Sequence, residues 1–289
     1  MTVPARILGR GVTAVEDLTR PWATAVRTSL VTLDDGRVVV HQAGLPTIAG
    51  RAGIARRLRL GRALGAAAPW LGVPAVLDGD PAADPPFSVT AFVPGRTGGE
   101  LLGSATDAVV LGRVAGEAAR AMALVPARSL GVGLPRTWGD ARRLRAAAER
   151  WLGGVDAIDR AIVDRIPALF DGPPVLAHGD LAPVNLVLRG ERLAGLLDLE
   201  RMRVAPAGFD AAWFRLLLRH HHPEWWDAAG PAFLGAAGLG DGPGVVARLD
   251  DLAVLACLEA AASLPRRSPA GASWVTRARE ILGGELPGP

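Results

Sequence analysis

Four polar residues that lie close together in the sequence carry the groups that phosphoryl transfer needs. The stretch HGDLAPVNL, residues 178–186, contains His178, Asp180 and Asn185, and Asp198 follows in GLLDLE. One carboxylate can orient an attacking hydroxyl and accept its proton, while an amide oxygen and a second carboxylate can hold Mg²⁺ against phosphate oxygens. Because this chemistry depends mainly on positioning and charge neutralisation, few residues suffice. The set therefore indicates phosphoryl-transfer chemistry.

Three short segments must hold these residues in place. The apolar run PPVLA leads into the loop, Pro183 stiffens its turn, and NLVL continues it as a strand. After a turn at residues 189–191, RLAGLLDL reads as a second strand, so the two segments are expected to form a hairpin. Asp198 ends the second strand, and its carboxylate should emerge beside the loop that carries Asp180 and Asn185.

The full set resembles a known family signature. HGDLAPVNL followed by GLLDLE is similar to the Brenner-type signature of the aminoglycoside phosphotransferase family, whose members share the protein-kinase fold. The family commonly continues with a Gly-(x)-Pro-x-x-Asp-hydrophobic-Ala segment, and PAGFDAAW supplies Asp210 there. A weaker resemblance covers most of the chain, since VPAVL and PFSVTAFVPG look like the strand before the hinge and the hinge itself.

The resemblance implies a role for each of these residues. Asp180 would be the catalytic base, and Asn185 and Asp198 would be the Mg²⁺ ligands. His178 would have a structural role, and Asp210 would brace the catalytic loop from a helix N-terminus. The implied co-substrates are ATP or GTP and a small molecule that carries a hydroxyl group.

Hydrophobic periodicity divides the chain into two parts. Strands are expected at 29–33, 37–42, 73–80 and 86–93, with a helix at 51–67. After a hinge near residues 92–98, apolar residues recur at helical spacing in 106–125, 137–152, 156–170, 208–219, 245–264 and 271–282.

The expected fold class is α+β: a bilobal protein-kinase-like fold with a small mixed α/β N-terminal lobe and a larger, mainly helical C-terminal lobe. Residues 1–94 would form the nucleotide-binding lobe, and residues 95–289 the catalytic and acceptor-binding lobe. A cleft between two lobes is a common place for ligands. The adenine or guanine is expected against the hinge strand, where Thr90, Ala91 and Val93 offer main-chain donors and acceptors.

The small lobe departs from the family pattern because the chain contains no lysine. The usual phosphate-binding lysine would fall near the end of RVVVHQ, where His41 and Gln42 stand. The usual glutamate partner would fall within RAGIARRLRLGR, which has no acid, so both halves of the expected ion pair are missing. The connection LTRPWATAVRTSL also lacks glycine, so a small phosphate-covering loop is not evident.

Two interpretations of this loss stay open. In the first, an active kinase contacts the phosphates through other groups: His41, Gln42, Arg27, Thr28, Ser29 or an arginine of residues 51–59. Arginine binds phosphate well, so His41 would be a hydrogen-bond donor and an arginine would supply the charge. In the second, the protein is a pseudokinase that binds a nucleotide in a regulatory role.

Residues after the expected metal ligand suggest the nature of the acceptor. Glu200 and Arg203 should lie near the cleft mouth, and His221 with Trp225 of RHHHPEWW could line an acceptor pocket. Incidental histidines at a helix end are the alternative for the latter pair. Segment 189–222 contains more arginines than acids, whereas a pocket for polycationic aminoglycosides should be rich in acids. A nucleoside-type or macrolide-type antibiotic, or a sugar, is therefore favoured over an aminoglycoside.

Composition excludes several other classes of function. No apolar run reaches the roughly 18 residues of a membrane helix, and the N-terminus has no signal-peptide stretch. The net charge is only +3 and the arginines are dispersed among acids, which argues against a nucleic-acid partner. The single cysteine, Cys257, sits in an apolar pattern. We therefore expect a cytoplasmic monomer or homodimer with no membrane or nucleic-acid partner.

The sequence thus predicts an enzyme that moves the γ-phosphate of ATP or GTP to a hydroxyl of a small molecule. Antibiotic inactivation is the favoured biological role. A sugar or alcohol kinase of primary metabolism is the alternative within the enzyme class, and a nucleotide-binding pseudokinase is the alternative outside it.

Overall fold

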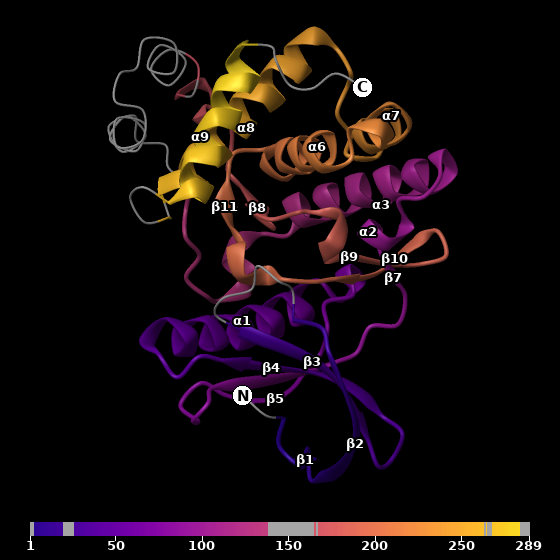
Figure 1. Ribbon diagram of the computed structural model, residues 1–289. Coiled ribbons are helices and arrows are strands. Elements are labelled where there is room, and N and C mark those ends of the chain that lie inside the picture. Colours follow the sequence, from indigo (N-terminus) through magenta and orange to yellow (C-terminus); the bar gives the residue numbers. More distant parts are fainter. Residues whose placement is uncertain are drawn as a thin grey trace. The chain divides into compact units, whose positions relative to one another are not determined.

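The chain forms two compact units, seen in a computed structural model that describes residues 3–19, 26–137, 165, 167–262, 264 and 268–283 (Figure 1). The first comprises Met1–Gly95, Arg128–Val132 and Leu193–Glu200, and the second Arg96–Ala127, Gly133–Arg192 and Arg201–Pro289. The helices expected at 137–152 and 156–170 lie almost wholly outside the described residues. A 3-10 helix, Pro167–Phe170, is described at the end of the latter range.

The first unit takes in more of the chain than the expected 1–94 lobe. Segment Leu193–Glu200 packs with it because two glycines allow a close approach. A Cβ on Gly72 would lie 2.3 Å from the Ala194 carbonyl oxygen, and one on Gly195 would lie 2.8 Å from a Val93 methyl. The segment that contains Asp198 is therefore part of the unit that the sequence predicts to bind nucleotide.

An antiparallel six-stranded sheet of order β1-β2-β3-β4-β6-β5 dominates the first unit. Its strands are β1 (Arg6–Ile7), β2 (Arg10–Asp17), β3 (Val26–Leu33), β4 (Val38–Gly44), β5 (Val76–Asp80) and β6 (Phe87–Ala91). Gly36, with φ 81°, makes the turn between β3 and β4, which confirms the expected Asp-Asp-Gly hairpin. Val31, Leu33, Val39 and Val89 are buried together with Ile7 as a core.

The long helix α1 (Ile48–Ala67) packs on this sheet and fits the expected helix at 51–67. Thr47 caps its start by accepting a hydrogen bond from the Gly50 N–H. Its buried side chains, Ile54, Leu58, Leu60 and Leu64, repeat at helical spacing.

Helices make up most of the second unit (Figure 1). They are α2 (Gly98–Leu101), α3 (Ala105–Leu124), α6 (Phe209–His221), α7 (Trp226–Ala236), α8 (Pro243–Ala262) and α9 (Pro269–Gly283). The short strands are β7 (Arg96–Thr97), β8 (Val175–Ala177), β9 (Leu186–Arg189) and β11 (Arg203–Ala205), and β10 (Arg192–Leu196) follows β9 across a turn at Gly190. β8 pairs with β11, and β7 pairs with β9.

The sequence prediction missed helix α7. Gly230 and Pro231 stand in its middle, and both residues normally argue against a helix interior. The helix is stabilised from outside, because its backbone packs directly on glycines of α3. A Cβ on Gly112 would lie 2.2 Å from the Ala229 carbonyl oxygen, and one on Gly116 would lie 2.4 Å from that of Phe233.

Cys257 is fully buried in α8, and burial raises the pKa of its thiol to about 12, so it remains protonated. Among the described helices, none is both long enough and apolar enough to cross a bilayer.

Candidate active site

The loop between β8 and β9 carries three of the expected site residues, His178, Asp180 and Asn185. Gly179 in this loop has a positive φ of 79°, and a Cβ there would lie 2.1 Å from the Arg201 carbonyl oxygen. Glycine is the residue that combines such a backbone angle with so close an approach at little cost. The glycine of the sequence pattern therefore sets the path of the loop.

Asp210 holds this loop by its main chain. The Asp210 side chain is buried at the start of α6, where Oδ2 accepts the His178 N–H at 2.7 Å and Oδ1 accepts the Gly179 N–H at 2.9 Å. Burial raises the pKa of the Asp210 carboxyl, whereas His178, the two backbone hydrogen bonds and Arg203 act in the opposite direction. Because both carboxylate oxygens are used, the loop depends on a side chain with two acceptors.

The variant Asp210→Asn is expected to lower the free energy of unfolding by about 1–3 kcal/mol, the cost of one unsatisfied buried donor. An amide offers one acceptor in place of two, so one of the two loop N–H groups would face an NH₂ group. Urea titration followed by circular dichroism measures the change. Asp241, an exposed residue, supplies the control Asp241→Asn, and equal stability losses in the two variants would contradict the bracing role.

A tryptophan orients the Asp180 carboxylate. Trp213, one helical turn after Asp210, donates its indole N–H to Asp180 Oδ1 at 2.8 Å. Its ring stacks on Trp274 of α9, with the ring centroids 5.2 Å apart. The Asp180 N–H donates to His178 Nδ1 at 3.2 Å. Oδ1 is thus fixed, and within the described part of the chain Oδ2 is the oxygen that can accept a proton.

Asn185 is buried near the end of the same loop, and its side chain points back to the loop's main chain. Its Nδ2 donates to the Asp180 carbonyl oxygen at 2.9 Å, which identifies the nitrogen and directs Oδ1 away from that carbonyl. An amide oxygen so placed can serve as a ligand for a hard cation. The described residues contain no cluster of three or more His, Cys, Asp or Glu side chains that could hold a metal by itself.

Asp198 lies in the first unit and has an uncommon backbone conformation. Its φ is 58°, a region that residues other than glycine rarely adopt and that recurs at functional sites. Arg57 of α1 places Nη2 3.9 Å from Asp198 Oδ1, and its Nε donates to Glu200 Oε1. Glu200, expected near the acceptor, is therefore engaged by a cation of α1.

One face of the first-unit sheet is turned toward α1. Gln42 is paired with Ser88, and Ser88 is paired with Gly79, so the three lie in one row and share a face. A Cβ on Gly79 would lie 2.5 Å from Leu58 Cδ2 of α1, which identifies the face. Gln42 therefore occupies the α1 side of β4.

Three of the expected phosphate-binding residues lie on the opposite face. His41 is paired with Ser29, and Arg27 is two residues away on the same strand as Ser29, so alternation puts all three on the side away from α1. His41 is buried and stacks on Phe87, with ring centroids 6.0 Å apart. Burial lowers its pKa, so His41 is uncharged at neutral pH. The structure thus brings Arg27, Ser29 and His41 together on one face of the sheet, whereas Arg57 belongs to α1 on the other side.

Hydrogen bonds within the sheet already use some main-chain groups of the expected hinge residues. Thr90 and Ala91 end β6, and the Ala91 N–H donates to the Ala75 carbonyl oxygen at 2.9 Å. Val93 follows β6 and lies against Gly195. A purine at this strand would therefore have to use main-chain groups other than the Ala91 N–H.

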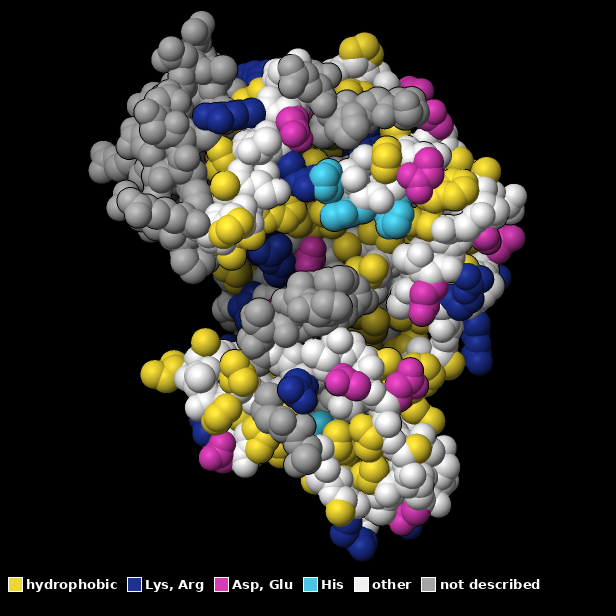
Figure 2. All heavy atoms as spheres, in the orientation of Figure 1, with side chains coloured by type: hydrophobic (Ala, Val, Ile, Leu, Met, Phe, Trp, Pro, Cys, Tyr) yellow, Lys and Arg dark blue, Asp and Glu magenta, His cyan; other side chains and the backbone are white. Residues whose placement is uncertain are grey.

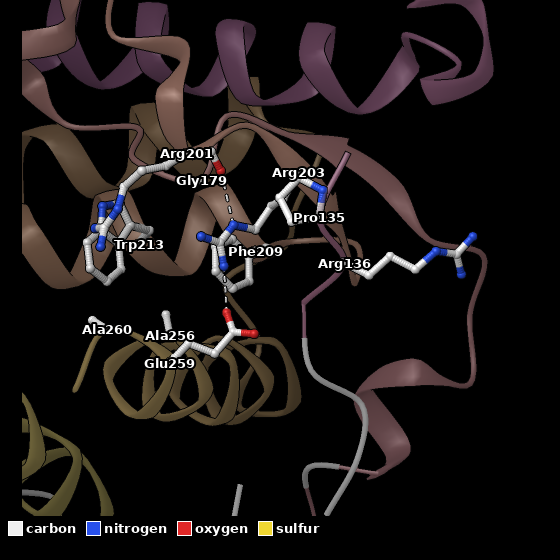
Figure 3. A pocket seen from close by; sticks show the side chains of 10 residues that line it. All are labelled: Pro135, Arg136, Gly179, Arg201, Arg203, Phe209, Trp213, Ala256, Glu259 and Ala260. Carbon is white, nitrogen blue, oxygen red and sulfur yellow. Dashed lines mark hydrogen bonds and ion pairs between the residues drawn. The ribbon is translucent and has the colours of Figure 1, made fainter. Parts of the chain in front are cut away.

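A pocket of about 170 Å³ in the second unit lies beside Trp213 (Figure 3). Its lining includes Gly179, Arg201, Arg203, Phe209, Trp213 and Glu259. Arg203 donates to Glu259 Oε2 at 2.6 Å and to the Arg201 carbonyl oxygen at 3.0 Å, so Glu259 balances its charge. The Arg201 guanidinium lies over the Trp213 ring, 5.9 Å from the centroid, whereas Arg136 points away in Figure 3. Arg201 makes this pocket mildly basic.

Two further residues expected at the acceptor do not line this pocket. His221 is exposed at the end of α6, and Trp225 lies in the 3-10 helix Pro223–Trp225. Figure 2 shows the histidine side chains of this region gathered on the surface. Burial, together with the nearby charge of Arg277 on α9, lowers the pKa of the adjacent His220 to about 4, so its imidazole is uncharged at neutral pH.

Sequence reasoning missed Trp213, although a signal was present. Asp210 and Trp213 are three residues apart on α6, so they share a helix face. Since Asp210 binds the loop, its neighbour on the same face can reach Asp180.

Comparison with known proteins identifies a matching family and similar folds. The model of a family described as the phosphotransferase enzyme family matches residues 20–251. A search of curated protein sequences gives no match.

Several solved structures share the fold. The GDP and kanamycin complex of APH(2'')-IIia has a TM-score of 0.69 at 14% sequence identity, over 95% of this chain and 93% of that one. Macrolide 2'-phosphotransferase MphH from Brachybacterium faecium has a TM-score of 0.64 at 18% identity, over 97% and 95%. A complex of aminoglycoside phosphotransferase APH(4)-Ia with ADP and hygromycin B has 0.66 at 18%, over 94% of each chain. The expected α+β, bilobal, protein-kinase-like fold class is confirmed.

Proposed function

This chain belongs to the phosphotransferase enzyme family, and we propose that it transfers the γ-phosphate of ATP or GTP to a hydroxyl group of a small molecule. The observation that carries the proposal is the Asp180 carboxylate, which the Trp213 indole fixes through one oxygen while its loop is held by Asp210. A carboxylate held in this way is suited to orienting a hydroxyl group.

We propose the following roles in the transfer. Asp180 Oδ2 accepts a hydrogen bond from the acceptor hydroxyl. As that oxygen forms its bond to the γ-phosphorus, the bond from the phosphorus to the β,γ-bridging oxygen breaks and its electron pair stays on the leaving diphosphate. The hydroxyl proton passes to Asp180. Asp210 and Trp213 hold Asp180 in place and do not touch the reacting atoms.

The donor set suits Mg²⁺, for which we propose Asn185 Oδ1 and the Asp198 carboxylate as ligands. Mg²⁺ prefers oxygen ligands and is commonly held by one or two carboxylates together with substrate phosphates, so a large protein cluster is not needed. When bound, the ion neutralises charge on the phosphate oxygens. The left-handed backbone of Asp198 and the orientation of the Asn185 amide support the assignment.

The basic character of the pocket beside Trp213 supports an acceptor that is neutral or anionic. Arg201 lies over the Trp213 ring, and Glu259, the one acid among the described residues that line the pocket, is paired with Arg203. A polycationic aminoglycoside would meet Arg201 unfavourably. We therefore favour a nucleoside-type or macrolide-type antibiotic, with a sugar or alcohol as the alternative, and a cytoplasmic reaction where nucleoside triphosphates are available.

A screen of hydroxyl compounds tests the proposal. The full chain is incubated with MgCl₂, ATP or GTP and panels of macrolides, nucleosides, aminoglycosides and sugars, and products are identified by a mass gain of one phosphate. A phosphorylated macrolide or nucleoside supports the favoured acceptor class, and a phosphorylated aminoglycoside contradicts it. If the protein binds nucleotide but modifies none of the panels, the pseudokinase alternative replaces the enzyme.

Trp213→Phe is expected to lower kcat about 10- to 100-fold, since a hydrogen bond to a charged group contributes roughly 1.5–3 kcal/mol. Phenylalanine keeps an aromatic ring against Trp274 but cannot donate to Asp180. Steady-state kinetics with the acceptor from the screen give kcat and KM. Trp274→Phe is the matched control, because it alters the stack and spares the hydrogen bond. Equal losses in both variants would assign Trp213 to packing alone.

A further inference from the structure

The arginines of α1 do not have equivalent surroundings. Arg51 donates to the carbonyl oxygens of Ala82 and Ala83. Arg59 and Arg62 are exposed. Arg57 is different, because its side chain is only 19% exposed and its guanidinium lies beside two carboxylates.

Those carboxylates belong to Asp198 and Glu200, in the segment that follows β10. Arg57 Nε pairs with Glu200, and Nη2 lies 3.9 Å from Asp198 Oδ1. Gly53, one turn earlier on α1, lies on the same face, where a Cβ would be 3.9 Å from Glu200 Oε1. Arg56 Nε also donates to the Glu200 carbonyl oxygen at 2.7 Å. Hydrogen bonds and ion pairs thus connect this face of α1 to the segment that carries Asp198.

We propose that Arg57 is the cation that binds the nucleotide phosphates in this lysine-free chain. The inference rests on the proposed function only as far as nucleotide binding. If Asp198 and the phosphate oxygens bind the same Mg²⁺ ion, those oxygens must lie close to Asp198. The Arg57 guanidinium is the cation that the described structure places beside this carboxylate. Its remaining N–H groups can donate to phosphate oxygens, and guanidinium binds them in a fixed, often bidentate geometry.

The assignment also explains why the usual positions lack both charges. β4 presents the neutral Gln42 toward α1, and α1 carries no acid in the expected stretch. An ion pair is present at other positions: the cation, Arg57, is on helix α1, and the acid, Glu200, lies in the segment after β10. Glu200 fixes the guanidinium through Nε and thereby directs its Nη groups. Arg57 is thus a phosphate-binding residue, and Glu200 is a positioning residue.

The test compares nucleotide binding with nucleoside binding. Arg57→Met keeps most of the apolar stem and removes the charge. Titration calorimetry on the full chain with MgCl₂ measures ATP, ADP and adenosine, and the guanine series if the wild type prefers GTP. The triphosphate and diphosphate are expected to bind about 10- to 100-fold more weakly to the variant, as for the loss of a charge-assisted hydrogen bond. The nucleoside affinity is expected to change less than threefold.

Arg59→Met is the matched control, because Arg59 is an exposed arginine two residues further along the same helix. It should bind all three ligands like the wild type. Unchanged ATP affinity in Arg57→Met, equal weakening of ATP and adenosine, or a wild type that binds no nucleotide would overturn the inference. A wild type that binds ATP through Arg57 but phosphorylates no acceptor would preserve this inference and reject the proposed phosphotransferase.

Discussion

Replacing Asp180 by alanine is expected to lower kcat for phosphoryl transfer about 10²- to 10⁴-fold, the range typical of a positioned general base. The proposed base touches the acceptor hydroxyl, whereas nucleotide binding is assigned to other residues. The KM for ATP or GTP should therefore stay within a few-fold of the wild-type value. Steady-state kinetics with the acceptor identified in the screen give both parameters.

Two variants separate the chemical role of Asp180 from a structural one. Asp180→Asn keeps an oxygen that can accept the Trp213 N–H, so it should fold like the wild type and still lose activity. Asp171 is an exposed aspartate in the same unit, and Asp171→Ala should retain full activity. An Asp180→Asn protein that works at the wild-type rate would rule out Asp180 as the base.

Replacing Gly179 by alanine is expected to lower the free energy of unfolding by about 2–5 kcal/mol. This sums the strain of a left-handed backbone and the cost of overpacking. The added Cβ would stand 2.1 Å from the Arg201 carbonyl oxygen. That oxygen belongs to the backbone and the Cβ is bonded directly to the Cα, so neither atom can rotate away. Relief requires movement of the loop that carries Asp180, so activity should fall together with stability. Urea titration followed by circular dichroism measures the change.

Gly190 supplies a matched control for the steric part of this prediction. Its φ is 59°, also left-handed, but a Cβ there meets nothing within 4 Å. Gly190→Ala should therefore cost only the backbone strain, roughly 1–2 kcal/mol. If the two alanine variants lose the same free energy of unfolding, the close contact at Gly179 adds nothing to the cost of its substitution.

The sequence was sufficient to predict elements whose pattern is local. Helices α1, α3, α6, α8 and α9 follow from apolar spacing, and the β3–β4 hairpin follows from Asp-Asp-Gly. Helix α7 could not be predicted, because its stability comes from contacts with Gly112 and Gly116, more than a hundred residues earlier in the chain. Distant packing of this kind leaves no periodic signal around Gly230 and Pro231.

The candidate site divides in the same way. The motif residues Asp180, Asn185 and Asp198 stand out because their types and spacing are distinctive, and their catalytic roles remain predictions. RVVVHQ shows that His41 and Gln42 point to opposite faces, but it does not show which face meets α1. That depends on the pairing of β4, β6 and β5 and on the contact between Gly79 and Leu58. The sequence therefore offered several arginines for the phosphates, and packing singles out Arg57.

The contact between Trp213 and Asp180 has an optical consequence. An indole that donates its N–H to a carboxylate and stacks on a second indole has emission that depends on both partners. A compound that binds Asp180 should therefore change the intrinsic fluorescence of the protein without any added label. Seven other tryptophans contribute background, and the difference spectrum between wild type and Trp213→Phe isolates the signal of this one ring. The protein thus contains its own spectroscopic probe for acceptor binding.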